Sequence, residues 1–385
     1  MIKDLYVFSK YSDNQASLRC RIFAIIQLSP ILNELSVRYN SLLLSPLYCS
    51  GLSVDNFFSY SIIFYAYIKR LLAILSLCIT LPKALVFIHE ELLPGFPAFF
   101  QVFLLKLLAY RHKLVIDVDD GLHLRRSFFN PFRAAFAYYP KYVDCIICGS
   151  PLLQKYYKAL TANTKPVFLF PTVPNSVFIP PSSYCLAKSP YYLEGASESC
   201  RLIGISNQLS QSGLLKIGWI GSPSTTKFIL RLASLIESSH LRNSVRFIVV
   251  GAVVDAHLPV IAFSCQWSPV IENIFFENID VGVMPLFRGC FERYKCSFKL
   301  IQYLASGVPC IGSPIGFNRI ILRYPFAIRA STKNDWIYSI DVLANKTNSE
   351  LSLLSQSAFD FYSQELHPNN YLAPIESCLS RLMSY

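Results

Sequence analysis

The residues best suited to chemistry are three carboxylates that stand close together, Asp117, Asp119 and Asp120. Carboxylates at this spacing repel one another, so the folded chain must place a cation or a proton donor beside them. A second group, His89-Glu90-Glu91, sets an imidazole next to carboxylates and could move protons near neutral pH. We therefore expect His89 and members of the carboxylate cluster to lie where a substrate reacts.

Both groups follow apolar runs that predict buried parallel strands, Ala84 to Ile88 and Lys113 to Val118. The carboxyl end of such a strand is where α/β enzymes hold their ligands. Two chemistries fit the carboxylates alone. They could hold a divalent cation that carries a nucleotide diphosphate, or Asp117 could be the nucleophile of a haloacid-dehalogenase-like phosphohydrolase.

A turn rich in small and hydroxyl residues predicts a phosphate site in the second half of the chain. The apolar strand Leu214 to Ile220 runs into Gly221-Ser222-Pro223-Ser224-Thr225-Thr226-Lys227, and a helical pattern starts at Phe228. Backbone N–H groups, hydroxyls and one lysine can converge on an anion at such a helix start. The turn lacks the G-x-x-x-x-G-K-[ST] pattern of a Walker A loop.

A second phosphate cradle is predicted just downstream. Lys299 to Ala305 has an apolar stripe at helical spacing, Gly307 ends this helix, and Val308 to Gly312 reads as a short buried strand. Lys295 and Lys299 stand just before and at the helix start, where free backbone N–H groups already favour an anion.

The run KLIQYLASGVPCIGSPIG, from Lys299 to Gly316, resembles the K-L-x-E-Y-M-A-x-G-x-P-V-V-x-S-x-x-G signature of retaining glycosyltransferases of family four. The resemblance implies an α/β chain with the GT-B fold, two Rossmann-like domains that face a central cleft. The turn from Gly221 to Lys227 is similar to the family's G-R-x-x-x-x-K loop. IDVDDGLHL is similar to a strand-end D-x-D-D-A loop of some members, which favours Asp119 and Asp120 as residues that face the sugar. The resemblance covers most of the chain, roughly Arg19 to Arg323.

The resemblance implies transfer of a sugar, with retention, from a nucleotide-sugar donor to an acceptor. The basic and apolar character of the chain favours a glycan or lipid-linked acceptor in bacterial envelope polysaccharide or lipopolysaccharide synthesis. The resemblance implies no cofactor and no bound metal. Arg19, near Arg21 at the first strand-to-helix crossing, and Glu90 are the candidates for the acceptor. The expected donor-binding residues are Gly221, Ser222, Ser224, Thr225, Lys227, Glu272, Lys295, Ser297, Phe298, Lys299 and Gln302.

Three positions depart from the family pattern. Ser222 replaces an arginine, and Tyr294 and Gln302 align with two glutamates, although Glu292 could substitute for the first. Gln302 could hydrogen-bond a ribose hydroxyl without charge. The departures keep a non-catalytic, glycosyltransferase-like binding protein as an alternative, beside the phosphohydrolase that would use Asp117.

Length and composition agree with two folded domains. The chain has 385 residues, of which 53% are hydrophobic and 15% charged, with a net charge of +11. We expect a first domain over 1–180, a linker of irregular surface over 181–212, a second domain over 213–355, and a C-terminal helix, 356–385, that returns to the first domain. A basic surface without a nucleic-acid motif favours a nucleotide diphosphate or an anionic membrane, rather than nucleic acid, as partner.

One apolar stretch, Phe57 to Leu81, resembles a membrane segment, but Lys69 and Arg70 interrupt it near the middle. We expect a helix that packs on a sheet and rests on a bilayer rather than one that spans it. The N-terminus lacks the apolar region of a signal peptide, and Cys145 and Cys148 read as buried small hydrophobes. These features predict a cytoplasmic protein, peripheral at the inner face of the plasma membrane.

Overall fold

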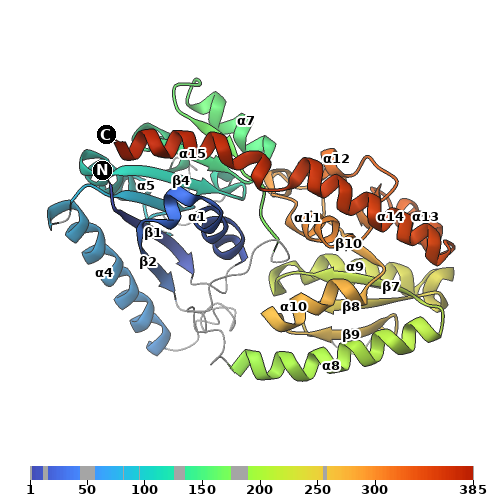
Figure 1. Cartoon of the computed structure of the whole chain (residues 1–385). Helices are drawn as coiled ribbons and strands as arrows, with labels where there is room; N and C mark the ends of the chain where they lie inside the picture. The colour runs from blue at the N-terminus through green and yellow to red at the C-terminus, as the bar shows by residue number, and fades with distance from the viewer. Residues whose placement is uncertain are drawn as a thin grey trace. The chain divides into compact units, whose positions relative to one another are not determined.

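The computed structural model describes residues 2–11, 16–43, 57–80, 82–94, 96–124, 135–174, 190–254 and 258–384. The chain forms two compact units (Figure 1). Unit 1 comprises residues 1–172, 293–296 and 368–385, and unit 2 comprises 173–292 and 297–367. Each unit is built on its own six-stranded sheet.

All strands of unit 1 pair in parallel, in the order β2-β1-β3-β4-β5-β6. They are β1 (Asp4–Tyr11), β2 (Ser36–Leu43), β3 (Leu85–His89), β4 (Lys113–Val118), β5 (Cys145–Cys148) and β6 (Val167–Leu169). The helical segments are η1 (Leu18–Phe23), α1 (Ala24–Leu28), α2 (Pro30–Asn33), α4 (Phe57–Thr80), α5 (Ala98–Arg111), η2 (Leu122–Leu124), α6 (Ala135–Tyr142), α7 (Pro151–Leu160) and α15 (Asn369–Ser384).

The sheet of unit 2 is also parallel, in the order β12-β11-β10-β7-β8-β9. Its strands are β7 (Leu215–Ile220), β8 (Val245–Val250), β9 (Ile261–Cys265), β10 (Val281–Met284), β11 (Cys310–Gly312) and β12 (Ala327–Arg329). The helical segments are α8 (Pro190–Gln211), η4 (Pro223–Thr225), α9 (Thr226–Glu237), η5 (His240–Asn243), α10 (Pro269–Phe275), η6 (Phe276–Asn278), α11 (Phe298–Ala305), α12 (Asn318–Ile321), α13 (Lys333–Ala344), α14 (Asn348–Phe361) and η8 (Tyr362–Leu366). The short segment η7 (Glu292–Tyr294) begins in unit 2 and ends in unit 1.

Helices cover both faces of the second sheet, as a doubly wound fold requires. The core on one face includes side chains of α8, α10, α11 and α14, and the core on the other face includes side chains of α9 and α13. Because both faces are covered, the central strands are apolar throughout, for example Val245–Val250. The predicted α/β class is therefore confirmed, and the strand predicted over Lys113–Val118 has the observed bounds.

The irregular surface predicted up to residue 212 is wrong over Pro190–Gln211, which forms α8. The side chains that α8 buries are Ser199, Leu202, Ser206 and Leu209, spaced three and four residues apart. Two of these four are serines, so the buried stripe carries little hydrophobic signal. The polar composition that suggested a linker thus belongs to a helix that packs through small residues.

Two local predictions in unit 1 also need correction. The apolar spacing from Ile22 to Leu35 favours one helix, but the helix is interrupted at Ser29, where the backbone is extended before Pro30. The chain then forms β2 (Ser36–Leu43), which the sequence did not predict. This strand lies at the sheet edge and carries arginine, asparagine and serine, so its composition did not indicate a buried strand.

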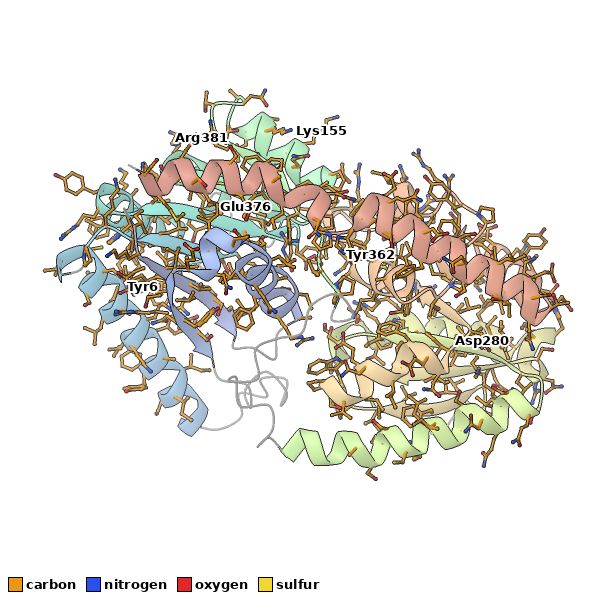
Figure 2. The ribbon with its side chains drawn as sticks, in the orientation of Figure 1. Tyr6, Lys155, Asp280, Tyr362, Glu376 and Arg381 are labelled. Atoms are coloured by element: carbon orange, nitrogen blue, oxygen red, sulfur yellow. The ribbon has the colours of Figure 1, made fainter. Side chains whose placement is uncertain are left out.

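The last helix, α15, belongs to unit 1. Its Glu376, labelled in Figure 2, accepts a hydrogen bond from the Ser29 hydroxyl at 2.7 Å. The amide of Ile2, next to β1, donates to the carbonyl of Met383 at 3.3 Å. Residues near both ends of the described chain are therefore joined within the same unit.

The helix α4 is the one described helix that is long and apolar enough to cross a membrane, judged by length and composition. The segment Ser61–Ile79 has a mean hydropathy of 1.9, and 17% of it is buried. The helix continues through Lys69 and Arg70, the two charges that interrupt the apolar run.

Candidate functional site

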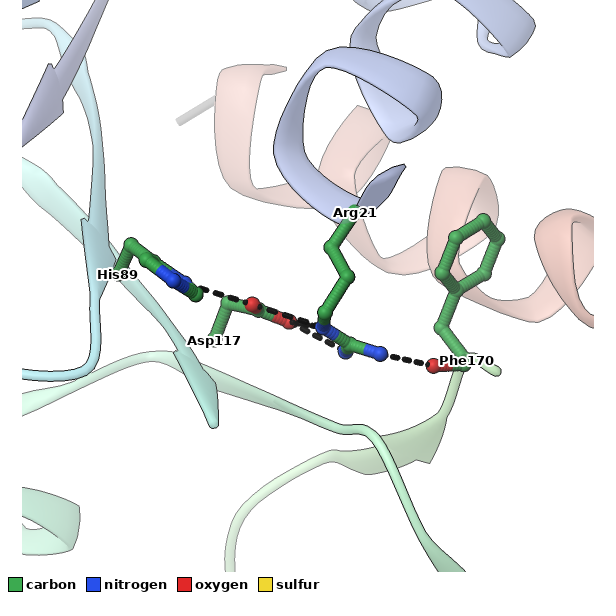
Figure 3. Close-up of polar contacts among 4 residues, drawn as sticks. All are labelled: Arg21, His89, Asp117 and Phe170. Atoms are coloured by element: carbon green, nitrogen blue, oxygen red, sulfur yellow. Dashed lines mark hydrogen bonds and ion pairs between the residues drawn. The ribbon is translucent and has the colours of Figure 1, made fainter. Parts of the chain in front are cut away.

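In unit 1 the two predicted clusters lie beside each other. His89, the last residue of β3, pairs in register with Asp117 of β4. The carboxylate of Asp117 accepts hydrogen bonds from Nε of Arg21 at 3.0 and 3.1 Å and from Nη2 of Arg21 at 2.5 Å (Figure 3). The third guanidinium nitrogen of Arg21, Nη1, donates to the carbonyl of Phe170 at 2.6 Å. The cation that the carboxylates need is therefore Arg21.

This ion pair has no contact with solvent, because the side chains of Arg21 and Asp117 are 0% and 1% exposed. Burial opposes the charge on Asp117, but the Arg21 charge and the hydrogen bonds from His89 and Arg21 outweigh it and lower the pKa of Asp117. Both oxygens of Asp117 are thus engaged. A phosphohydrolase nucleophile must be free to attack, so the structure argues against Asp117 in that role.

His89 extends this arrangement. Its Nδ1 lies 3.0 Å from Oδ2 of Asp117, and its buried Nε2 has no hydrogen-bond partner among the described residues. Burial lowers the pKa of His89, but the hydrogen bond to Asp117 and the charges of Asp119, Asp117 and Glu90 raise it to about 9. The imidazole is therefore protonated at neutral pH and holds an unused N–H donor.

Asp119, which follows β4, provides the complementary acceptor. Its Oδ1 is buried and likewise lacks a hydrogen-bond partner within the described part of the chain. Burial opposes its charge, but the charge of His89, a hydrogen bond with Glu90 and the charge of Arg21 lower its pKa to about 2. Buried polar atoms normally have partners, so a donor and an acceptor left open together suit a bound hydroxyl group.

The same residues bear on metal binding. His89, Glu90 and Asp119 each offer a ligand atom, and these atoms lie within 4.8 Å of one another. A metal would have to displace the proton that the carboxylates hold on His89.

Glu90 also has a left-handed backbone, with φ of 64°, and its amide donates to the carbonyl of Asp117 at 2.8 Å. Such strain in a residue other than glycine is often found at functional sites.

Gly149, after β5, is a site residue that the sequence did not indicate. A Cβ at this position would lie 2.9 Å from Cα of Asp119 and 3.1 Å from Nη1 of Arg21. Any side chain would therefore push Asp119 away from the ion pair. The Arg21 guanidinium is occupied by Asp117 and Phe170, so it does not offer a site for an acceptor phosphate. Arg19 is buried on η1, and Asp120 is half-buried.

The segment Arg293–Cys296 belongs to unit 1. The ring of Tyr294 packs edge-on against His123 at 4.5 Å, and its carbonyl accepts a hydrogen bond from the Ser150 hydroxyl at 3.1 Å. Burial and the charges of Asp119 and Asp120 raise the pKa of Cys296 to about 11. Tyr294, which aligns with a family glutamate, thus serves packing. Lys295 falls in unit 1, whereas Lys299, with which it was expected to form one phosphate cradle, belongs to unit 2.

In unit 2 the turn after β7 is closely packed. Gly251 has φ of 98°, and a Cβ on it would lie 1.7 Å from the carbonyl oxygen of Gly221. A Cβ on Gly221 would meet the Trp219 ring at 2.5 Å and Cε of Lys299 at 2.9 Å. The Lys299 ammonium lies 5.4 Å from the centroid of the Trp219 ring. The start of α11 therefore meets the Gly221 turn, and Lys227 is exposed on the first turn of α9.

The starts of α9 and α11 lack side-chain caps. Thr225 and Ser297 occupy their N-cap positions, but neither makes the capping hydrogen bond. Thr225 Oγ1 donates instead to the carbonyl of Ser222 at 2.9 Å, and Ser297 Oγ donates to Oδ1 of Asn318 at 2.6 Å.

Other helices of the same unit are capped. Ser268, Thr332 and Thr347 cap α10, α13 and α14 with their hydroxyls. The two predicted diphosphate helices thus leave first-turn N–H groups without a side-chain cap, and these groups suit an external anion. Phe298 is half-buried at the first position of α11. The hydroxyls of Ser222 and Ser224 form a hydrogen bond of 2.9 Å.

Gln302 and Glu272, two further donor candidates, contact each other. The buried Glu272 carboxylate accepts from Nε2 of Gln302 at 2.8 Å and from Nε1 of Trp267 at 2.7 Å. A glutamate at position 302 would place a second carboxylate beside Glu272, and the two charges would repel. The amide of Gln302 is therefore the side chain that suits this neighbour, which explains locally why the sequence departs from the family pattern.

Comparison with known proteins identifies the fold. No protein-family model matches the chain, and no curated protein sequence matches it. Among solved structures it is similar to an α,α-trehalose-phosphate synthase (UDP-forming) from Burkholderia vietnamiensis, with 10% identity and a TM-score of 0.62 over 100% of this chain and 99% of that one.

Two other solved structures agree. Sucrose-phosphate synthase from Thermosynechococcus elongatus has 11% identity and a TM-score of 0.62 over 99% of both chains. Anabaena HepE in complex with UDP and glucose has 10% identity and a TM-score of 0.60 over 100% of both chains. These similarities confirm the predicted GT-B fold.

The ion pair in unit 1 gives a stability prediction. Asp117→Asn leaves the buried Arg21 charge without a counter-ion, so we expect the free energy of unfolding to fall by about 3–5 kcal/mol. Urea denaturation measures this change. The control is Asp4→Asn, since Asp4 faces the 57% exposed Arg38 at 3.8 Å and should cost less than about 1 kcal/mol. Equal losses in the two variants would contradict the assigned role of Arg21.

His89 gives a pH prediction. Its pKa is raised in the folded chain, from 6.5 to about 9, so protonation stabilises the fold. This contribution is complete below pH 6.5 and is lost as the pH rises through about 9. The difference in unfolding free energy between the wild type and His89→Gln should therefore shrink over that range. Denaturation series from about pH 6 to about pH 10 test it; a difference that stays constant would mean that His89 is neutral throughout.

Proposed function

We propose that the protein transfers a sugar from a nucleotide-sugar donor to a hydroxyl of an acceptor. The observation that carries this proposal is the arrangement at Gly221 in unit 2, where Lys299 reaches the turn that leads into α9. Two helix starts without side-chain caps, two lysines and a turn of small residues suit a diphosphate. The GT-B fold shared with sugar-phosphate synthases supports it.

In this proposal unit 2 holds the donor. Lys227, Lys299 and the backbone at Gly221 and Ser297 bind the diphosphate. Stabilising the departing diphosphate is the largest catalytic contribution, because the bond to the sugar breaks there. Glu272 and Gln302, which already contact each other, are assigned to the nucleoside part of the donor.

In this proposal unit 1 holds the acceptor. The Nε2–H of His89 donates to the acceptor hydroxyl, and the ionised Oδ1 of Asp119 accepts its proton or steadies the positive charge that develops on the sugar. Asp120 and Glu90 bind neighbouring hydroxyls, and Arg19 binds a charged group of the acceptor. We propose retention at the anomeric carbon and a reaction in which the lysines, rather than a metal ion, neutralise the diphosphate.

The surface charge and the cysteines bear on the pathway. The ten described cysteines are all free, which suits the reducing cytoplasm. The net charge of +11 suits an acceptor that is phosphorylated or embedded among anionic lipids. We therefore propose a glycan or lipid-linked acceptor in bacterial envelope polysaccharide synthesis.

Donor binding is tested by thermal shift with UDP-, GDP-, ADP- and dTDP-sugars. A ligand at 100 times its Kd should stabilise the folded chain by about 2.7 kcal/mol, which is roughly 5 °C or more in Tm. Lys299→Ala should abolish the shift. Lys333→Ala is the control, because Lys333 also begins a helix, but one capped by Thr332. If none of the donors raises Tm, or if both variants respond alike, the assignment of the donor to the Gly221 turn is wrong.

The role of Asp119 is tested separately, with the donor identified by the thermal shift. Asp119→Asn should lower the transfer rate by about 10²–10⁴-fold, because the acceptor loses its base, while the donor-induced shift in Tm stays unchanged. Asp341→Asn, in the exposed part of α13, serves as control. Donor binding without transfer in the wild type would favour the non-catalytic alternative, and hydrolysis of a generic phosphate ester would favour a phosphohydrolase.

A further inference from the structure

We propose that α4 and α5 form a face that docks on an anionic lipid bilayer. We call it the α4–α5 face and define it by Phe64, Tyr65 and Leu72 on α4 and by Phe99, Phe103 and Tyr110 on α5. The inference stands on burial, hydrogen bonds and charge in unit 1, and it holds whether or not the protein transfers sugars.

A buried arginine attaches α4 to the sheet. The guanidinium of Arg70 donates to the carbonyl of Ser9 at 2.5 Å, to the carbonyl of Leu92 at 3.0 Å, and to Oδ1 and the carbonyl of Asn40 at 2.5 and 2.6 Å. Ile74 and Leu77 continue the same buried stripe at spacings of four and three residues. Crossing a membrane would break these hydrogen bonds, so α4 lies along unit 1.

The opposite side of α4 is apolar and uncovered. Phe64, Tyr65 and Leu72 are 68%, 67% and 61% exposed, and 17% of the apolar segment Ser61–Ile79 is buried. A core helix of equal hydropathy would be mostly buried. Large apolar side chains gathered on one face of the folded chain indicate a surface that another apolar phase covers.

The helix α5 extends this surface. Phe99, Phe103, Lys106 and Tyr110 follow one another at spacings of four, three and four residues, so they form one stripe, and all four are exposed. The two helices contact each other. Nη1 of Arg111, at the end of α5, donates to the carbonyls of Cys78 and Ile79 at 2.9 and 2.8 Å. These hydrogen bonds connect the C-terminal ends of α4 and α5.

The charges on α4 and α5 indicate that an anionic bilayer covers the α4–α5 face. The two helices contain Lys69, Arg70, Lys106 and Arg111 and no Asp or Glu. Lys69 and Lys106 are exposed beside the apolar residues, where long stems can lie on apolar surface while the ammonium reaches a phosphate. Tyrosines among them suit the boundary between headgroups and acyl chains. A second copy of the chain fits less well, because a symmetric contact would bring like charges together.

The docking face has a consequence for substrates, which rests on the proposed function. Unit 1 carries both the α4–α5 face and the His89–Asp119 cluster assigned to the acceptor. A bilayer bound at this face would bring unit 1 to lipid-linked molecules, so the acceptor class favoured by the face is an amphiphile with a lipid anchor.

The test is flotation of the full chain with vesicles. We expect binding to vesicles that contain phosphatidylglycerol, little binding to pure phosphatidylcholine, and release at high salt. Phe64→Gln combined with Leu72→Gln should weaken binding at least about tenfold, because the variant removes two exposed apolar side chains. Lys69→Glu combined with Lys106→Glu should abolish the preference for phosphatidylglycerol.

The matched control is Tyr338→Gln combined with Leu353→Gln, two residues of unit 2 that are 69% and 70% exposed and should leave binding unchanged. Vesicle binding is independent of donor binding and transfer, so failure here leaves the proposed function intact. Absence of vesicle binding, or equal binding by all variants, overturns the proposal. A dimer in light scattering that the Phe64/Leu72 variant dissociates would also overturn the proposal, because it indicates that a second copy covers the face. A chain that resists alkaline extraction from membranes would overturn it as well, because it indicates a spanning helix.

Discussion

The structure of unit 1 depends on a buried charge that must be neutralised. A lone ion away from water is strongly disfavoured, and it persists only with a counter-charge and a full set of hydrogen bonds. Arg21 and Asp117 meet this requirement together, with Phe170 accepting the remaining donor. The pair lies at the end of β4. The hydrogen bond to Asp117 helps to raise the pKa of His89, and the charges of His89 and Arg21 help to lower the pKa of Asp119.

Arg70 is a second buried arginine, and its charge is satisfied by hydrogen bonds to uncharged oxygens. Among the described residues no carboxylate contacts Arg70, so carbonyl and amide oxygens satisfy its guanidinium, and burial lowers its pKa to about 9. One arginine therefore organises the carboxylate cluster and the other attaches α4 to the sheet. In unit 2 the cations are used differently, because Lys227 and Lys299 lie at helix starts that no side chain caps.

Local rules predicted much of this fold. Apolar runs gave the central strands in both units, because a strand covered on both faces must be apolar along its length. The prediction failed where a buried stripe was made of small polar residues, as in α8, and where an edge strand was polar, as in β2. At the candidate site, His89, Asp119, Lys227 and Lys299 were found from residue type and position in a motif, and their chemical roles stay proposals.

The sequence by itself determined the α/β class, the position of charged groups after strands, and the spacing from Gly221 to Lys227, because each depends on neighbours within a few residues. Only the tertiary structure decided which groups pair. Arg21 and Asp117 are 96 residues apart in the chain, and Gln302 and Glu272 are 30 apart. The charge state of a buried group depends on such distant partners and on the water excluded around them, and no pattern of adjacent residues carries that information.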